Sequence, residues 1–139
     1  MSWDVFIMKE KYDFEAPEEE QPPVPPLGQR DEIIEKLTRR IPNLDYRDKA
    51  WGFLEGEGYS MEFNTGEEEL VNSIMLHVRG GGAVMETIRL VCETLEAYAL
   101  DTSDSGYIDF EQPEQAEQSW EQFQRYRDQV INQVINKDN

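Results

Sequence analysis

A chain of 139 residues has the length of one ordinary domain, and we expect residues 1–139 to form a single domain with its own hydrophobic core. Its 13 lysine and arginine residues stand against 30 aspartate and glutamate residues, so the formal net charge is -17. This charge argues against binding to nucleic acid or to an anionic membrane surface, and it favours a basic protein as partner.

The first residues predict a strand. Residues 2–8 alternate between two faces, with Trp3, Val5 and Ile7 on the more apolar one. The segment MSWDVFIMKEK has no basic stretch followed by an apolar core, and no apolar run approaches the ~20 residues that a transmembrane helix needs. We therefore expect a cytoplasmic protein.

An acidic, proline-rich segment follows at about residues 10–27. Glu18, Glu19 and Glu20 precede the run PPVPP, and the segment lacks the apolar period of a helix or a strand. Because such a segment cannot bury a core, we expect it to be a mobile loop.

The rest of the chain predicts further helices and strands. Residues 29–41 and 83–97 have apolar residues at helical spacing, and the second helix holds Cys92, the only cysteine. A lone cysteine excludes an intrachain disulfide, and its apolar neighbours predict a buried thiol. Strands are expected at residues 50–55, 59–64, 71–79, 98–100 and 107–110.

A C-terminal helix is expected at about residues 113–137, with Pro113 in its first turn. Apolar residues form a stripe along one side of this helix, and either the sheet or a second copy of the chain must cover that stripe. The pattern therefore also predicts a homodimer. The stripe consists of Ala116, Trp120, Phe123, Val130, Val134 and Ile135.

The resulting order, β-α-β-β-β-α-β-α, indicates the α+β class: a two-layer sandwich whose mainly antiparallel sheet has helices packed on one face. We assign five large side chains of the expected hairpin to one sheet face: Trp51, Phe53, Tyr59, Met61 and Phe63. We expect a helix to cover this face; left exposed, it is typical of a protein-binding surface.

The letters RGGGAV have two interpretations. Glycines before a helix let backbone N–H groups approach an anion, which gives a candidate ligand site: His77, Arg79, Gly80, Gly81 and Gly82. The dinucleotide and P-loop fingerprints are both absent. The alternative, which we favour, is a sharp turn, and then Gly81→Ala should lower stability because alanine is penalised at positive φ.

His77 is the only histidine. With Asp101 or Glu55 it would form a proton-transfer pair if the fold brought them together. The sequence supplies neither an accompanying nucleophile nor a cluster of metal ligands, so we expect a hydrogen-bonded or surface histidine. No catalytic residue and no cofactor is therefore assigned.

The stretch DTSDSGYIDFEQ is similar to a calcium loop. A glycine takes the sharp-turn position, and oxygen-bearing side chains fall at four ligand positions: Asp101, Ser103, Ser105 and Asp109. Gln112 stands where the bidentate glutamate belongs, so we expect a hairpin turn in place of a metal site.

The stretch WGFLEGEGYSMEFNTGEEELVNSIMLHVRGGG, with YALDTSDSGYIDF after it, resembles a group of small uncharacterised bacterial proteins. Their shared pattern is W-G-x-L-E-G-x-G-x-S-x-E-F, then I-M-L-H-V-R-G-G-G, then A-L-D, and the resemblance covers about residues 1–110. It implies a bacterial, soluble α+β domain. The group is also associated with immunity proteins that neutralise polymorphic toxins, but the resemblance brings no established activity and no site residues.

Two functions follow as hypotheses. The first is a non-catalytic, acidic protein-binding module, an immunity-type inhibitor of a basic toxin. Its expected contact residues are the exposed acids Glu18, Glu19, Glu20, Glu67, Glu68 and Glu69. The alternative is a small-ligand or anion-binding protein, or an enzyme, that uses His77, Arg79 and the Gly80–Gly82 turn.

Overall fold

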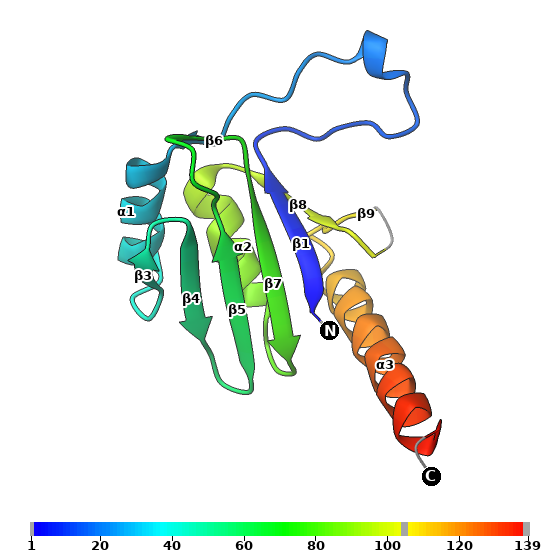
Figure 1. Cartoon of the computed structure of the whole chain (residues 1–139). Coiled ribbons are helices and arrows are strands. Elements are labelled where there is room, and N and C mark those ends of the chain that lie inside the picture. The colour runs from blue at the N-terminus through cyan, green and yellow to red at the C-terminus, as the bar shows by residue number, and fades with distance from the viewer. Residues whose placement is uncertain (1, 104–105, 138–139) are drawn as a thin grey trace.

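The computed structural model describes residues 2–103 and 106–137 and confirms the α+β class. The main sheet has the strand order β3-β4-β5-β7-β1-β8-β9, and neighbouring strands are antiparallel (Figure 1). Its strands are β1 (Trp3–Met8), β3 (Asp45–Asp48), β4 (Trp51–Glu55), β5 (Tyr59–Asn64), β7 (Ser73–Gly80), β8 (Tyr98–Asp101) and β9 (Gly106–Tyr107).

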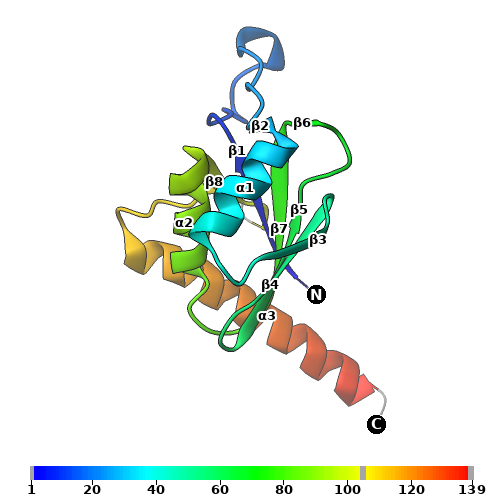
Figure 2. The ribbon, with the colours of Figure 1, turned by 90° about the vertical axis from the view of Figure 1, so that its left-hand side faces the viewer.

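Two helices, α1 (Arg30–Arg40) and α2 (Met85–Leu95), pack on one face of this sheet and give the expected two layers (Figure 2). Their apolar stripes face the buried side of the strands, because each helix presents one face at 3.6-residue spacing and each strand one face at a spacing of two. The core between the layers includes Val5, Ile7, Leu37, Met61, Phe63, Leu76, Ile88 and Val91.

The third helix, α3 (Pro113–Lys137), starts on the side of the other two helices, passes the end of the sheet and projects beyond it (Figures 1 and 2). Its first half docks: Ala116 and Trp120 are buried, and the Trp120 ring lies 5.1 Å from that of Trp3. Farther along, Ile131 and Val134 are exposed, and the side chain of Ile135 lies outside the described residues. The expected stripe is therefore covered only in its first half.

None of the helices in the described ranges combines the length and the apolarity needed to cross a membrane.

Several short elements were not expected from the sequence. β2 (Gly28–Gln29) pairs with β6 (Leu70–Val71) in a separate small sheet, and Glu18–Glu20 form a short 3-10 helix, η1. β3, with the sequence DYRD, is an edge strand whose residues are mostly exposed. Charged side chains are common on edge strands because they discourage pairing with other chains. Charged residues are also common in loops, so the composition of β3 does not distinguish it from a loop.

Outside η1, the segment between β1 and β2 has no helix or strand, as expected for the acidic loop (Figure 1). It is held locally: the amide of Tyr12 donates to the Tyr107 hydroxyl, and that hydroxyl donates to the Tyr12 carbonyl at 3.0 Å. Gln21 and Asp13 exchange two hydrogen bonds, at 2.7 and 2.5 Å. The mobility of this segment stays a prediction.

The assignment of five hairpin side chains to one covered face is wrong. In the antiparallel pair of β4 and β5, Gly52 lies opposite Phe63 and Leu54 opposite Met61, and directly opposed residues share a face. Met61 and Phe63 are therefore buried with Leu54, whereas Trp51 points to the other side together with Phe53. The sheet face without α1 and α2 is called the open face below.

Candidate functional site

Two rows of side chains cross the strands of the open face side by side. One is mostly apolar and is called the apolar row, and the other holds most of the charges and is called the charged row. Each row follows from the register, since opposed residues of successive antiparallel pairs line up perpendicular to the strands. The apolar row is Trp51, Asn64, Met75, Phe6, Leu100 and Tyr107. The charged row is Phe53, Glu62, His77 and Asp4.

Two aromatic side chains on this face are open to solvent. Trp51 is 43% exposed and Phe53 is 47% exposed, while Phe6 and Met75 are half-buried. The helices α1 and α2 lie on the other face of the sheet (Figure 2). Neighbouring apolar side chains that stay uncovered on a sheet face are typical of a surface that binds another protein.

His77, on β7, contacts side chains from two other strands, Asp4 on β1 and Trp51 on β4. Its Nδ1 lies 2.8 Å from Asp4 Oδ1, a hydrogen bond that the carboxylate accepts, and its ring stacks on Trp51 with centroids 6.1 Å apart. The expected partners of His77 were Asp101 or Glu55, and that expectation is wrong. Asp101 lies opposite Val5 with its side chain buried, and Glu55 lies opposite Ser60, outside the charged row.

Arg79 is already paired, because its guanidinium donates to the Glu62 carboxylate of the neighbouring strand. It lines a shallow hollow of about 280 Å³ together with Gly80 and Glu55, but His77 is not among the lining residues. The five candidate ligand residues therefore do not converge on one cavity, and the guanidinium has a carboxylate where an anion would bind.

The three glycines have different roles. Gly80 (φ +94°) and Gly82 (φ +90°) adopt backbone angles that favour glycine, and a Cβ on either would lie within 2.7 Å of a carbonyl oxygen in the β4–β5 turn. Gly81 has no such angle, and a Cβ there would meet only the Gln124 side chain, at 3.2 Å. The expectation of a positive φ at Gly81 is therefore wrong, and Gly80 and Gly82 carry the constraint.

This glycine turn serves as a docking point for α3. The indole of Trp120 donates to the Gly82 carbonyl at 3.0 Å, and Arg127 donates to the Gly80 carbonyl at 2.6 Å. The Gly81 N–H donates to the Gly58 carbonyl at 2.8 Å, so it is not free to bind an anion. These contacts favour the structural interpretation of RGGG over an anion cradle.

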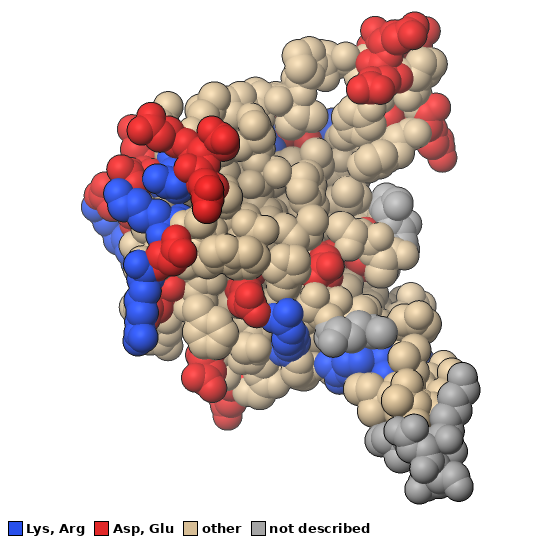
Figure 3. Space-filling model, in the orientation of Figure 1, with Lys and Arg blue, Asp and Glu red and all other residues tan. Residues whose placement is uncertain are grey.

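The acids expected to contact a partner lie around the open face. Glu18–Glu20 form the exposed η1 turn of the long loop, and Glu67–Glu69 are exposed between β5 and β6. Acidic side chains gather over the loop and over the side with α1 and β6, where cations lie among them, whereas most of the sheet face between is neutral (Figure 3). The open face thus combines apolar side chains with a few paired charged ones, Glu62 with Arg79 and Asp4 with His77, and has further acids at its margins.

The calcium alternative finds little support in the geometry. Asp101 Oδ1 accepts hydrogen bonds from the Trp3 indole and from Ser103, and Asp109 Oδ1 accepts one from the Glu111 amide at 3.0 Å. Ser105 lies outside the described residues. Within the described part of the chain, no three histidine, cysteine, aspartate or glutamate side chains are gathered as metal ligands.

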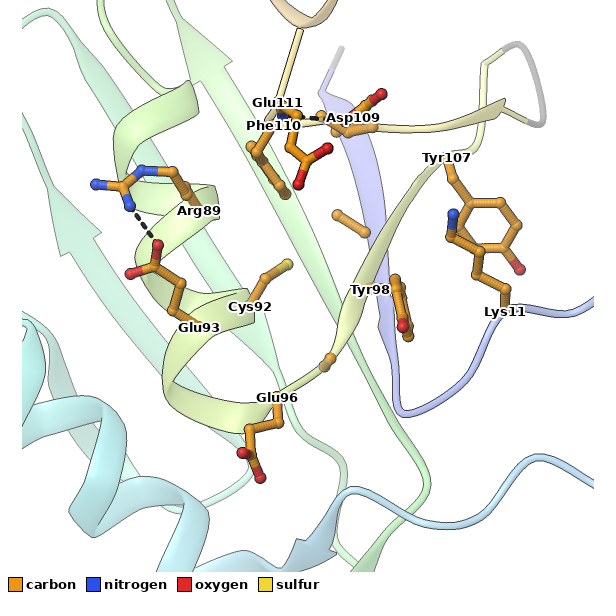
Figure 4. Close-up of a pocket in the computed structure, with 13 residues that line it drawn as sticks. Lys11, Arg89, Cys92, Glu93, Glu96, Tyr98, Tyr107, Asp109, Phe110 and Glu111 are labelled. Atoms are coloured by element: carbon orange, nitrogen blue, oxygen red, sulfur yellow. Dashed lines mark hydrogen bonds and ion pairs between the residues drawn. The ribbon is translucent and has the colours of Figure 1, made fainter. Parts of the chain in front are cut away.

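A groove of about 830 Å³ lies between α2 and the segment after β8 (Figure 4). Lys11 lies over the rings of Tyr98 and Tyr107, with its Nζ 5.3 and 5.6 Å from their centroids. Arg89 is paired with Glu93 on the same helix. The cations of this groove are thus engaged within the chain, and no histidine is among its lining residues.

Cys92 lies at the floor of the groove and is buried, as expected. Burial, assisted by the nearby Glu93 charge, raises the pKa of its thiol to about 12. Because the thiolate is the nucleophilic form, we expect Cys92 to react slowly at neutral pH.

The sequence pointed to His77 but not to its partner Asp4, and it left the exposure of Trp51 and Phe53 only as an alternative to a covered face. Alternation in residues 2–8 put Asp4 on the less apolar face, yet only the pairing of β1 with β7 brings it to His77. No protein-family model, curated protein or solved structure matches the sequence, so the open face stands as the candidate site on its geometry and charge.

Proposed function

We propose that the protein is a non-catalytic binding module whose open sheet face binds a basic protein. The observation that carries the proposal is the uncovered pair Trp51 and Phe53, on a sheet face without a covering helix. Aromatic side chains dominate the binding energy of protein interfaces, and truncating one such anchor commonly costs about 2 kcal/mol or more, roughly 30-fold in affinity.

The charge distribution supports a cationic partner. A formal charge of -17 and acids at the margins of the face attract a cationic protein and raise its association rate. The charged side chains on the face itself are already paired, Glu62 with Arg79 and Asp4 with His77, so close apolar contact around them does not bury an unpaired charge.

The resemblance to a bacterial group associated with immunity proteins supports a narrower version of the proposal. In that version the partner is a basic toxin, which the protein neutralises in the cytoplasm by covering its functional surface. An inhibitor of this kind needs surface complementarity and no catalytic residues, which agrees with the paired state of His77 and Arg79.

A second copy of the chain is the other proposed partner, through the end of α3 that projects from the body. Ile131 is 47% exposed and Val134 is 56% exposed on this end. If two copies of the chain paired these helix ends about a two-fold axis, each copy would cover the exposed apolar residues of the other.

The open face is tested by a double variant, Trp51→Ala with Phe53→Ala, against a partner recovered at low salt. We expect the melting temperature to stay close to that of the parent protein, because both side chains are already about half exposed. Affinity for the partner, measured by surface plasmon resonance, should fall at least about 30-fold, mainly through faster dissociation.

Leu70→Ala is the matched control, since Leu70 is 45% exposed but belongs to the separate small sheet. It should leave the affinity unchanged. Unchanged binding by the double variant, or an equal loss in the Leu70 control, would remove the open face from the proposal.

A further inference from the structure

A cavity of about 390 Å³ lies between the end of β8 and α3, at the opposite edge of the sheet from Trp51. Asp101 lines it and is only 2% exposed. The other lining residues are mostly neutral and polar or aromatic: Ser103, Ser119, Gln122, Phe123 and Tyr126.

The Asp101 carboxylate is satisfied on one oxygen only. Its Oδ1 accepts from the Trp3 indole at 2.9 Å, from the Ser103 amide at 2.9 Å and from the Ser103 hydroxyl at 2.6 Å. Its Oδ2 is buried and has no hydrogen-bond partner in the described structure. None of the ion pairs among the described residues includes Asp101.

Burying a carboxylate oxygen without a hydrogen-bond donor costs free energy, so a ligand group that donates a hydrogen bond to Asp101 Oδ2 would be stabilising there. A cation that carries N–H groups supplies the donor and the compensating charge together. The serine hydroxyls and the Gln122 amide can accept the remaining N–H groups, and aromatic rings such as Phe123 and Tyr126 attract cations.

One of the two aromatic rings that line the cavity, Phe123, is packed against the core. Phe123 stacks on Trp120 with ring centroids 6.1 Å apart and an interplanar angle of 9°, and Trp120 lies 5.1 Å from Trp3. The Asp101 carboxylate is oriented by the three hydrogen bonds that it accepts from Trp3 and Ser103. Both recognition elements are therefore preorganised, which lowers the entropic cost of binding.

We propose that this cavity binds a cationic side chain, arginine or lysine, supplied by the partner protein. The inference rests on the proposed function for the origin of the side chain and deepens it, because it gives a basic partner a buried anchor in addition to long-range attraction. The site itself can be tested without any partner.

The test uses the full-length protein labelled with 15N and titrated with N-acetyl-arginine amide or N-acetyl-lysine amide. The Trp3 indole N–H donates to Asp101, so its resonance reports directly on the carboxylate, and the exposed Trp51 indole serves as an internal reference. We expect a saturable shift of the Trp3 signal. The neutral isostere N-acetyl-citrulline amide should bind at least about tenfold more weakly, since it lacks the charge.

Two variants assign the response to the cavity. Asp101→Asn should abolish it, and Ser119→Leu should do so by filling the cavity from α3 while leaving the carboxylate in place. Gln118→Leu, exposed on the same helix and outside the cavity, should bind like the parent protein.

The proposal is overturned if neither cation gives a saturable Trp3 shift, if citrulline binds equally well, or if Ser119→Leu leaves the response intact. A Trp3 shift with calcium chloride and none with the amides would assign the cavity to a metal ion instead. Failure here leaves the open-face proposal standing, because the Trp51 and Phe53 variants test that surface separately.

Discussion

Replacing Gly80 by alanine tests the structural role of the glycine turn. The backbone of Gly80 has φ +94°, and a Cβ there would lie 2.6 Å from the Gly58 carbonyl oxygen, a contact that real Cβ atoms essentially never make. The Gly58 oxygen belongs to the backbone and the Cβ position is fixed by the backbone of residue 80, so relief requires the β4–β5 turn to move away from β7. The carbonyl of Gly80 itself accepts a hydrogen bond from Arg127 of α3, so strain at this position also reaches the docking of that helix.

The magnitude follows from these two effects. A left-handed conformation costs a residue with a side chain about 1–2 kcal/mol, and overpacking costs a further 1–3 kcal/mol, so the loss in unfolding free energy is about 2–5 kcal/mol. With a urea m-value of about 2 kcal/mol/M, the unfolding midpoint should fall by about 1–2.5 M. Against a total stability of about 5–15 kcal/mol, this loss is easily measured.

Urea denaturation followed by tryptophan fluorescence provides the assay, with Gly81→Ala as the matched control. Gly81 lacks a positive φ and its new methyl would meet only the end of a flexible side chain, so its midpoint should stay within about 0.5 M of the parent value. A Gly80→Ala protein as stable as its parent, or a Gly81→Ala protein equally destabilised, would refute the reasoning. Stabilisation of the parent by phosphate, absent in Gly81→Ala, would restore the anion interpretation.

Three further predictions concern charge, the thiol and the end of α3. Replacing Glu67, Glu68 and Glu69 by glutamine should slow association with a basic partner and flatten its salt dependence, with no change in melting temperature; an association rate that ignores both would contradict the steering role. Burial raises the pKa of Cys92 to about 12 from 9.0, so the native thiol should resist iodoacetamide at pH 8 and react only in urea. The unfolded thiol ionises first, so the contribution of Cys92 to stability should decline as the pH rises from about 9 towards 12. Rapid labelling of the native protein would contradict the burial of this thiol. Self-association through α3 predicts a dimer in light scattering that Ile131→Glu with Val134→Glu converts to a monomer, whereas a monomeric parent protein would remove this interface.

The regular elements were predictable because their patterns are local. Branched or aliphatic residues recur at every second position of β7, at Ile74, Leu76 and Val78, and α2 repeats its apolar residues at helical spacing, so each could be located within about two residues. β3 was not predictable, since an exposed edge strand with charged residues has the composition of a turn. Two-residue pairs such as β2 and β6 are too short to leave a period in the sequence.

The candidate site was only partly predictable, because it depends on pairings between distant residues. His77 and Asp4 meet across 73 positions, and no local pattern encodes that distance. The burial of Met61 and the exposure of Trp51 depend on the β4–β5 register, and a shift of one residue would exchange the faces. Gly81 looked like its neighbours in sequence, but the turn demands glycine angles only on either side of it.

The most direct test of the central claim is site-specific photo-crosslinking in the native lysate at low salt. A photoreactive residue replaces Phe53 on the open face in one protein and exposed Lys36 on α1 in another. We predict that the Phe53 position forms an adduct with a basic protein, that higher salt suppresses this adduct, and that the Lys36 position does not form it. An adduct with the same protein from Lys36 alone, or no adduct with a basic protein from the Phe53 position, would contradict the claim that the open face is the binding surface.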